Sequence, residues 1–191
     1  IRDKLNYCTL EVTEFANVQN VLNEIRPDQI YNLAAQSFVA DSFQFPHYIS
    51  DVNYMGVLNI LEAMRILKLD TKLYQASTSE MYGDVLEKPQ TEKTPFNPLS
   101  PYAVSKLGTH SLVVNYRQAY DMFATSGILF NHESELRGLE FVTRKITSWL
   151  AEIKLQGKDA LPLGNLSSVR DWGYAPEYTD MMIKMLEHDK P

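Results

Sequence analysis

Residues 74–106 read YQASTSEMYGDVLEKPQTEKTPFNPLSPYAVSK, and this stretch decides the fold class of the chain. It begins as an apolar strand, passes through hydroxyl groups and a carboxylate, and finishes at the start of a helix. Ser100 followed by Pro101 is typical of a helix N-terminus, with Ser100 as the N-cap and Pro101 in the first turn. Ligands of open α/β sheets bind outside the carboxyl ends of the strands, so the stretch predicts a binding site where the strand ends.

Tyr102 and Lys106 lie four residues apart, which places them on one face of the predicted helix. A phenol has an ordinary pKa near ~10 and is a poor base at neutral pH, but a nearby ammonium lowers that pKa. The pair therefore predicts a tyrosine that can accept a proton from a hydroxyl group. The same spacing also occurs on inert helix surfaces. Thr78 and Glu80 at the preceding strand end favour the functional interpretation, because one α/β site would collect all four side chains.

Composition indicates an ordinary globular chain. The 191 residues suffice for one core, and 45% of them are hydrophobic and 22% charged. The net charge of −6 argues against general affinity for nucleic acid or anionic membrane, and no apolar run approaches the roughly 20 residues of a membrane span. Scattered histidines and the absence of CxxC predict no metal site. The single cysteine, Cys8, fits a cytoplasmic protein.

Strands and helices are predicted to alternate, which favours an α/β fold with a Rossmann-type, doubly wound parallel sheet. We expect strands over 5–12, 29–35, 73–76, 124–130 and 161–163, and helices over 13–26, 46–67, 101–120, 140–156 and 177–187. Thr13 is expected to be the N-cap of the first helix, and Gly157 is expected to end the fourth. Residues 1–130 are predicted to form a partial dinucleotide-binding domain. Residues 131–191 are predicted to begin a smaller substrate-binding region that is intertwined with it.

A dinucleotide fold needs a glycine-rich turn after its first strand, so that the backbone can approach the pyrophosphate. None of the glycines in this sequence forms such a motif. We therefore expect the N-terminal strands and the glycine-rich turn to be missing from this chain and to precede Ile1.

Two groups of motifs connect the chain to known enzymes. STSEMYG (77–83) followed by SPYAVSK (100–106) resembles the extended short-chain dehydrogenase/reductase family of nucleotide-sugar enzymes. ILFNHES (128–134), RGLEFVTRKIT (137–147) and RDWGYAPEY (170–178) resemble the GDP-mannose 4,6-dehydratases within it. The similarity extends from Leu10 to about Tyr178, and the second group of motifs is the more specific.

The resemblance implies conversion of GDP-mannose to GDP-4-dehydro-6-deoxy-mannose, with tightly bound NADP, or NAD, used transiently. Tyr102, assisted by Lys106, would remove the proton of the 4-hydroxyl while hydride leaves C4. Glu80 would then remove the C5 proton and help the C6 hydroxyl leave as water, before hydride returns to C6. Thr78 would hydrogen-bond the oxygen at C4.

The resemblance also implies binding residues. Cofactor contacts are expected from Glu11, Val12, Leu33, Ala34, Ala35, Gln36, Ser37, Tyr48, Tyr102, Lys106, His132 and Arg137. Substrate contacts are expected from Ser37, Thr78, Asn131, Lys145 and Arg170. From the residues alone, plainer interpretations stay open: a solvated carboxylate at Glu11, close strand–helix packing at 33–37, a loop histidine at His132 and a solvated basic face at 143–145.

The resemblance further implies a homodimer or homotetramer that pairs through a helix bundle containing the Tyr102 helix. Two other hypotheses remain open. A related epimerase or 4-reductase would need the Tyr102–Lys106 pair but no base at C5, so Glu80 discriminates against it. A non-catalytic protein could share the fold, since fold does not fix function, but it would not need the intact set of four polar residues.

Overall fold

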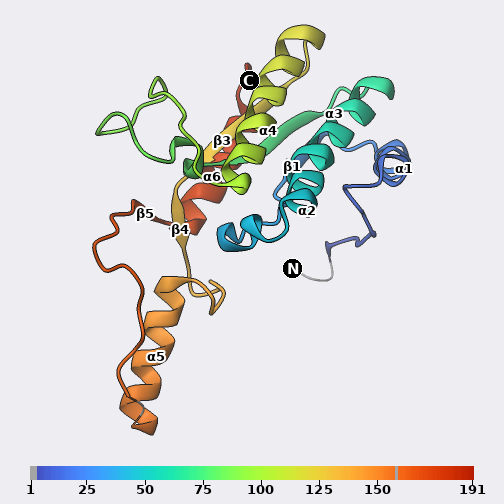
Figure 1. The fold of residues 1–191 in the computed structure, drawn as a ribbon. Helices are drawn as coiled ribbons and strands as arrows, with labels where there is room; N and C mark the ends of the chain where they lie inside the picture. The colour runs from blue at the N-terminus through green and yellow to red at the C-terminus, as the bar shows by residue number, and fades with distance from the viewer. Residues whose placement is uncertain (1–3, 158) are drawn as a thin grey trace. The chain divides into compact units, whose positions relative to one another are not determined.

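A computed structural model describes residues 4–157 and 159–191. The chain divides into two compact units (Figure 1). Unit 1 contains the residues up to Ile128 together with Met182–Pro191, and unit 2 contains Leu129–Met181.

The sheet of unit 1 confirms the predicted α/β, Rossmann-type fold class. Its strands lie in the order β1 (Gln29–Asn32), β2 (Lys72–Thr78) and β3 (Ala124–Leu129). β1 and β2 are parallel, with Ile30 opposite Leu73 and Tyr31 opposite Tyr74. Every residue of β2 after Lys72 is buried, as expected of a strand that is covered on both faces.

Helices of unit 1 pack on the sheet through one apolar core. They are α1 (Phe15–Ile25), α2 (Pro46–Ser50), α3 (Gly56–Ile66) and α4 (Pro101–Tyr120), with short helical segments η2 (Val39–Phe43), η3 (Asp51–Met55) and η4 (Ser79–Tyr82). The core includes Val18 and Leu22 of α1, Ile60, Leu61 and Met64 of α3, Leu73 of β2, and Val113 and Tyr116 of α4. These are the apolar faces that the helical spacing predicts.

The predicted strand over 5–12 is wrong. These residues form no strand, and their side chains are exposed apart from Val12, with Leu5 51% and Tyr7 78% exposed. A strand is stabilised by its ladder to a neighbour, and no other described strand pairs with this segment. Thr13 is not the N-cap of α1 either, because Glu14 takes that position and the Thr13 hydroxyl donates to Glu11.

Two predicted elements are interrupted. The strand expected over 29–35 ends at Asn32, whose side chain accepts a hydrogen bond from Ala34 N at 3.2 Å and so turns the backbone out of the ladder. The single helix expected over 46–67 is divided by η3, a π-helical turn. Such turns admit one extra residue and are frequent at functional sites.

Unit 2 contains two short parallel strands and a long helix. β4 (Asn131–Glu133) pairs with β5 (Trp172–Tyr174), with Asn131 opposite Trp172 and Glu133 opposite Tyr174. α5 (Val142–Gln156) ends at Gly157, whose φ of 67° is left-handed and confirms the predicted glycine stop. Residues 131–133 lie outside the predicted strands, but the structure shows that they form one.

The prediction of a strand over 161–163 is wrong. The strand of this region is β5, which lies later in the chain. Pro162 has no N–H for a ladder, and its carbonyl accepts a hydrogen bond from Lys145 Nζ at 2.9 Å. The last helix, α6 (Ala175–Glu187), begins two residues earlier than predicted. Residues from Met182 onward belong to unit 1, where Leu186 is buried and its carbonyl accepts from Lys72 Nζ at 2.7 Å.

None of the helices within 4–157 and 159–191 combines the length and apolar character needed to cross a membrane. Those residues also hold no group of three or more His, Cys, Asp or Glu side chains that could bind a metal ion.

Candidate active site

Strand β2 and segment η4 bring Thr78 and Glu80 to the carboxyl end of the sheet. Thr78 is the last residue of β2 and the N-cap of η4, and its hydroxyl accepts a hydrogen bond from Glu80 N at 3.2 Å. The side chain of Thr78 is 8% exposed, whereas Glu80 is half-buried. This local cap fixes the backbone that carries the Glu80 carboxylate.

Helix α4 begins as the sequence predicts. The Ser100 hydroxyl accepts a hydrogen bond from Ala103 N at 3.1 Å, and Pro101 occupies the first turn. Tyr102 and Lys106 follow one turn apart and are only 7% and 3% exposed. The start of α4 therefore directs both side chains into the interior of unit 1.

Three observations bring these four residues to one place. Lys106 Nζ donates a 2.8 Å hydrogen bond to the carbonyl of Ala76, two residues before Thr78 in β2. The phenol of Tyr102 shares a hydrogen bond with the Thr78 side chain and lies within the electrostatic reach of Glu80. The predicted set therefore converges at the carboxyl end of β2.

The electrostatics differ from the sequence-based expectation. We expected Lys106 to lower the pKa of Tyr102, but burial raises the pKa of Tyr102. The hydrogen bond with Thr78 opposes this rise and the charge of Glu80 adds to it. Burial also lowers the pKa of Lys106, to about 8. Burial is the largest cause of both shifts because both groups lie in the interior.

Asn53 is part of the site region and was not singled out from the sequence. It is 1% exposed and lies in the π-helical turn η3. Its side chain accepts from Gln36 N at 2.9 Å and donates to Gln36 O at 3.1 Å and to Ser105 Oγ at 3.3 Å. Ser105 Oγ donates in turn to Tyr102 O, and Thr109 Oγ1 donates to Asn53 O.

This network joins the loop after β1 to the face of α4 next to Lys106. A sequence signal for it existed: Asn53 falls four residues after Ile49 and seven before Ile60, on the predicted apolar stripe. A polar residue at such a position needs hydrogen-bond partners.

The residues of unit 1 that are expected to contact a cofactor lie in the loop after β1, in α2, at the start of α4 and in the segment before α1. Leu33 and Tyr48 are 56% and 58% exposed, while Gln36 is held by Asn53. Ala34 and Ser37 are exposed, and Ala35 is half-buried.

Glu11 and Val12 lie before α1. The Glu11 carboxylate accepts hydrogen bonds from Thr13, which lower its pKa. Val12 is buried, and its carbonyl accepts from Asn59 Nδ2 at 2.8 Å. The side chain of Glu11 is thus exposed, while the Val12 backbone is fixed against α3.

The remaining predicted residues lie in unit 2. His132 in β4 stacks on Tyr178, with ring centroids 4.9 Å apart, and its Nδ1 lies 2.8 Å from Phe130 O. Lys145 Nζ is bonded to the carbonyl of Pro162, and Arg170 Nη1 donates to Val169 O at 2.8 Å.

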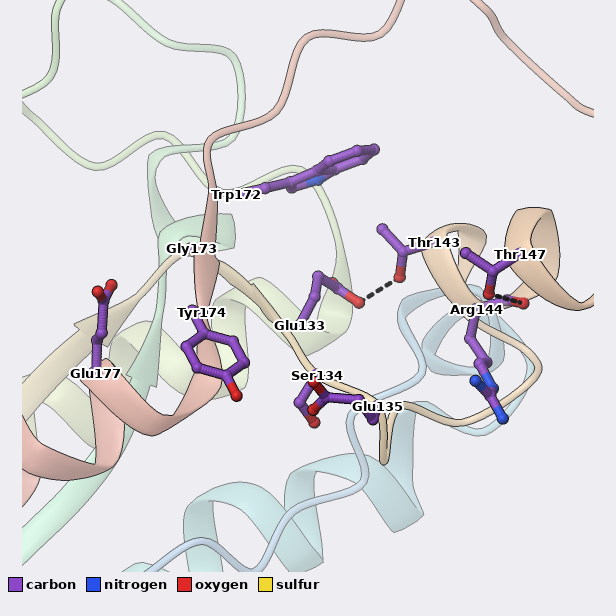
Figure 2. A pocket seen from close by; sticks show the side chains of 10 residues that line it. All are labelled: Glu133, Ser134, Glu135, Thr143, Arg144, Thr147, Trp172, Gly173, Tyr174 and Glu177. Carbon is purple, nitrogen blue, oxygen red and sulfur yellow. Dashed lines mark hydrogen bonds between the residues drawn. The ribbon is translucent and has the colours of Figure 1, made fainter.

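A cavity of about 610 Å³ opens within unit 2 (Figure 2). Its lining combines carboxylates, hydroxyls, aromatic rings and one guanidinium: Glu133, Ser134, Glu135, Thr143, Arg144, Thr147, Trp172, Gly173, Tyr174 and Glu177. None of the predicted substrate ligands Asn131, Lys145 and Arg170 lines it. Of the basic residues at the start of α5, it is Arg144 that reaches the cavity.

Comparison with known proteins shows the family of the chain. The sequence model of the family described as GDP-mannose 4,6 dehydratase matches residues 1–191. A GDP-mannose 4,6-dehydratase of Yersinia enterocolitica is 54% identical over 183 residues, covering 95% of this chain and 49% of that protein. The chain belongs to the GDP-mannose 4,6-dehydratase family. It spans about half the length of the curated relatives it matches.

Solved structures share the fold. RMD from Pseudomonas aeruginosa, complexed with NADPH, has a TM-score of 0.87 and 26% identity, covering 96% of this chain and 62% of that chain. dTDP-glucose 4,6-dehydratase from Bacillus anthracis, in complex with NAD, has a TM-score of 0.81 and 28% identity. It covers 100% of this chain and 58% of that chain.

Proposed function

We propose that this chain carries the catalytic residues of a GDP-mannose 4,6-dehydratase, which converts GDP-mannose to GDP-4-dehydro-6-deoxy-mannose. The observation that carries this proposal is the convergence of Thr78, Glu80 and Tyr102 at the carboxyl end of β2. The family match supports the substrate class.

The residues present fit a nicotinamide cofactor, and we propose NADP, with NAD as the alternative. Leu33 and Tyr48 expose apolar surface beside the loop after β1, where planar rings can lie. The Lys106 ammonium carries three donors, of which Ala76 O takes one, so it can also bond ribose hydroxyls. When bound, the cofactor would accept a hydride from C4 of the sugar and return it at C6.

The chain's own residues would move the protons. Tyr102 takes the proton of the 4-hydroxyl, and Thr78, already hydrogen-bonded to Tyr102, aligns the oxygen at C4. The resulting 4-ketone acidifies the C5 proton. Glu80 removes that proton and assists the loss of the C6 hydroxyl as water, which is general acid–base catalysis by one carboxyl group. When hydride has been added at C6, C5 takes up a proton, and Tyr102 can supply the one that it took from the 4-hydroxyl.

Glu80 distinguishes this proposal from a 4-epimerase or 4-reductase, which has no elimination to catalyse. Its carboxylate is half-buried and lies close enough to affect the pKa of Tyr102, so both groups can act on one sugar. A non-catalytic role leaves the burial of the Lys106 ammonium unexplained, because burying a cation is unfavourable.

We further propose a cytoplasmic homodimer or homotetramer that pairs through α3 and α4. Apolar side chains on these helices support it: Val104 is 57% and Ile66 46% exposed. Burial of exposed apolar surface is a main driving force of association.

The direct test uses the full-length protein, GDP-mannose and NADP. We expect NMR to show a 6-deoxy methyl group and a carbonyl at C4, without net accumulation of reduced cofactor. Tyr102→Phe serves as the matched inactive control. Recovery of unchanged substrate, or of a 4-epimer that keeps its C6 hydroxyl, would contradict the proposal.

A further inference from the structure

The loop 134–141 of unit 2 joins β4 to α5 and carries Arg137. Two contacts hold the guanidinium of this residue. Arg137 Nε lies 3.2 Å from Glu133 Oε2, and Arg137 Cζ lies 3.5 Å from the centroid of the Phe141 ring. Arg137 N also donates to Ser134 O at 3.1 Å. Neither side-chain contact uses the Nη edge, which is the part of the fork that can bind a phosphate.

Glu133 connects this loop to helix α5. The oxygen that faces Arg137, Oε2, also accepts a hydrogen bond from the hydroxyl of Thr143. Figure 2 shows Glu133 reaching from β4 toward Thr143 in the first turn of α5. One carboxylate oxygen therefore joins the strand, the loop arginine and the helix.

The contact between Glu133 and Arg137 is mainly one of charge. Their side chains are 18% and 25% exposed, so solvent screens the pair less than it screens a surface pair. Although the distance is short, the Nε–H is not aligned with the oxygen, and Nε is buried without a hydrogen-bond acceptor. The electrostatic attraction and the stacking on Phe141 together restrict the guanidinium.

We propose that Glu133 is a positioning residue that holds Arg137 in place for a phosphate group of the dinucleotide cofactor. This inference rests on the proposed function and on the predicted contact of Arg137 with the cofactor. Ordering the arginine before binding lowers the entropy cost of binding, because the long side chain has already lost its freedom. Glu133 would act on cofactor binding through Arg137.

Glu133→Gln tests this role in the full-length protein. Glutamine keeps the shape and an oxygen for Thr143 but removes the charge that faces Arg137. We expect NADP to bind about five-fold more weakly by calorimetry, the scale of a single partly exposed ion pair. Affinity for GDP should stay unchanged. In an Arg137→Met background, Glu133→Gln should have no further effect on NADP affinity.

The matched control is Glu135→Gln, which removes an exposed carboxylate two residues away and should leave NADP affinity unchanged. A second variant, Glu133→Asp, keeps the charge and should bind NADP more tightly than Glu133→Gln. Unchanged or tighter NADP binding by Glu133→Gln would overturn the inference. So would an equal loss of NADP and GDP affinity, which would indicate general loosening of unit 2. Failure of the parent protein to bind NADP would instead contradict the proposed function.

Discussion

At the scale of single residues, the most informative group is Lys106. The residue is 3% exposed, and its ammonium donates a hydrogen bond to the backbone carbonyl of Ala76. Burial lowers the pKa of Lys106 to about 8, against 10.5 for an ordinary lysine. Burying this ammonium therefore destabilises the folded chain, at a position where the proposed chemistry needs a cation.

This burial predicts how stability depends on pH. The pKa of Lys106 is about 8 in the folded chain, so from there to 10.5 the unfolded chain binds a proton that the folded chain does not. Stability should therefore rise with pH across this window. Below the window, Lys106 is charged in both states, and the full destabilisation from burying its charge is present. Between pH 7 and pH 10, the free energy of unfolding of the parent should rise by about 2–3 kcal/mol relative to Lys106→Met.

Urea denaturation of the full-length protein at several pH values checks this difference. Lys93→Met is the matched control, because it removes an exposed ammonium from the loop before α4. If the difference in the free energy of unfolding between the parent and Lys106→Met does not change with pH, Lys106 is not desolvated in the folded chain.

Tyr102 shows what a sequence cannot give at this scale. The four-residue spacing to Lys106 predicted that the two side chains share a helix face, and the structure places both inside unit 1. The predicted direction of the Tyr102 pKa shift was wrong. The shift depends on burial by neighbouring elements, which the spacing of two residues does not reveal.

At the scale of elements, η4 and its C-terminal glycine hold the backbone of Glu80. Gly83 has a φ of 51°, and a Cβ there would lie 1.9 Å from Asn97 O. Asn97 N donates in turn to Met81 O at 3.0 Å. The loop before α4 can approach η4 this closely because residue 83 has no side chain.

Gly83→Ala should therefore destabilise the protein by about 2–4 kcal/mol, from backbone strain plus steric overlap. It should also lower the turnover number, since η4 carries Glu80. Gly157→Ala is the matched control: its φ is 67°, but a Cβ would meet nothing within 4 Å, so only strain remains. Thermal unfolding of both variants measures the difference, and equal losses would contradict the packing argument.

Elements defined by local signals could be predicted, and those defined by partners could not. The Ser100–Pro101 start of α4 and the Gly157 end of α5 are local and are confirmed. The prediction of a strand over 5–12 was wrong because a strand depends on pairing with a neighbour, and the sequence of the segment alone does not show whether a partner is present. β5 was missed because three residues carry too little periodicity.

At the scale of the molecule, the sequence predicted the fold class because strands and helices alternate along its whole length. The predicted catalytic residues meet in unit 1, since the carboxyl end of β2 and the start of α4 are both fixed by short-range signals. The predicted substrate ligands Lys145 and Arg170 donate hydrogen bonds to backbone carbonyls of unit 2, those of Pro162 and Val169. Their positions depend on longer loops of unit 2, whose path no local pattern determines.

In the proposed mechanism, Tyr102 and Glu80 act on one sugar in two successive steps. The measurement that tests it most directly compares Tyr102→Phe with Glu80→Gln in the full-length protein incubated with NADP and GDP-mannose in deuterated solvent. Absorbance reports reduced cofactor on the enzyme, while NMR reports C5 deuterium and loss of water.

Tyr102→Phe should block every step, including cofactor reduction. Glu80→Gln should still form reduced cofactor and a 4-keto-hexose, while exchange at C5 and dehydration slow by at least about 10²-fold, the lower range for a general acid–base group. Dehydration by Glu80→Gln at the parent rate would show that Glu80 is not the base and would contradict the account.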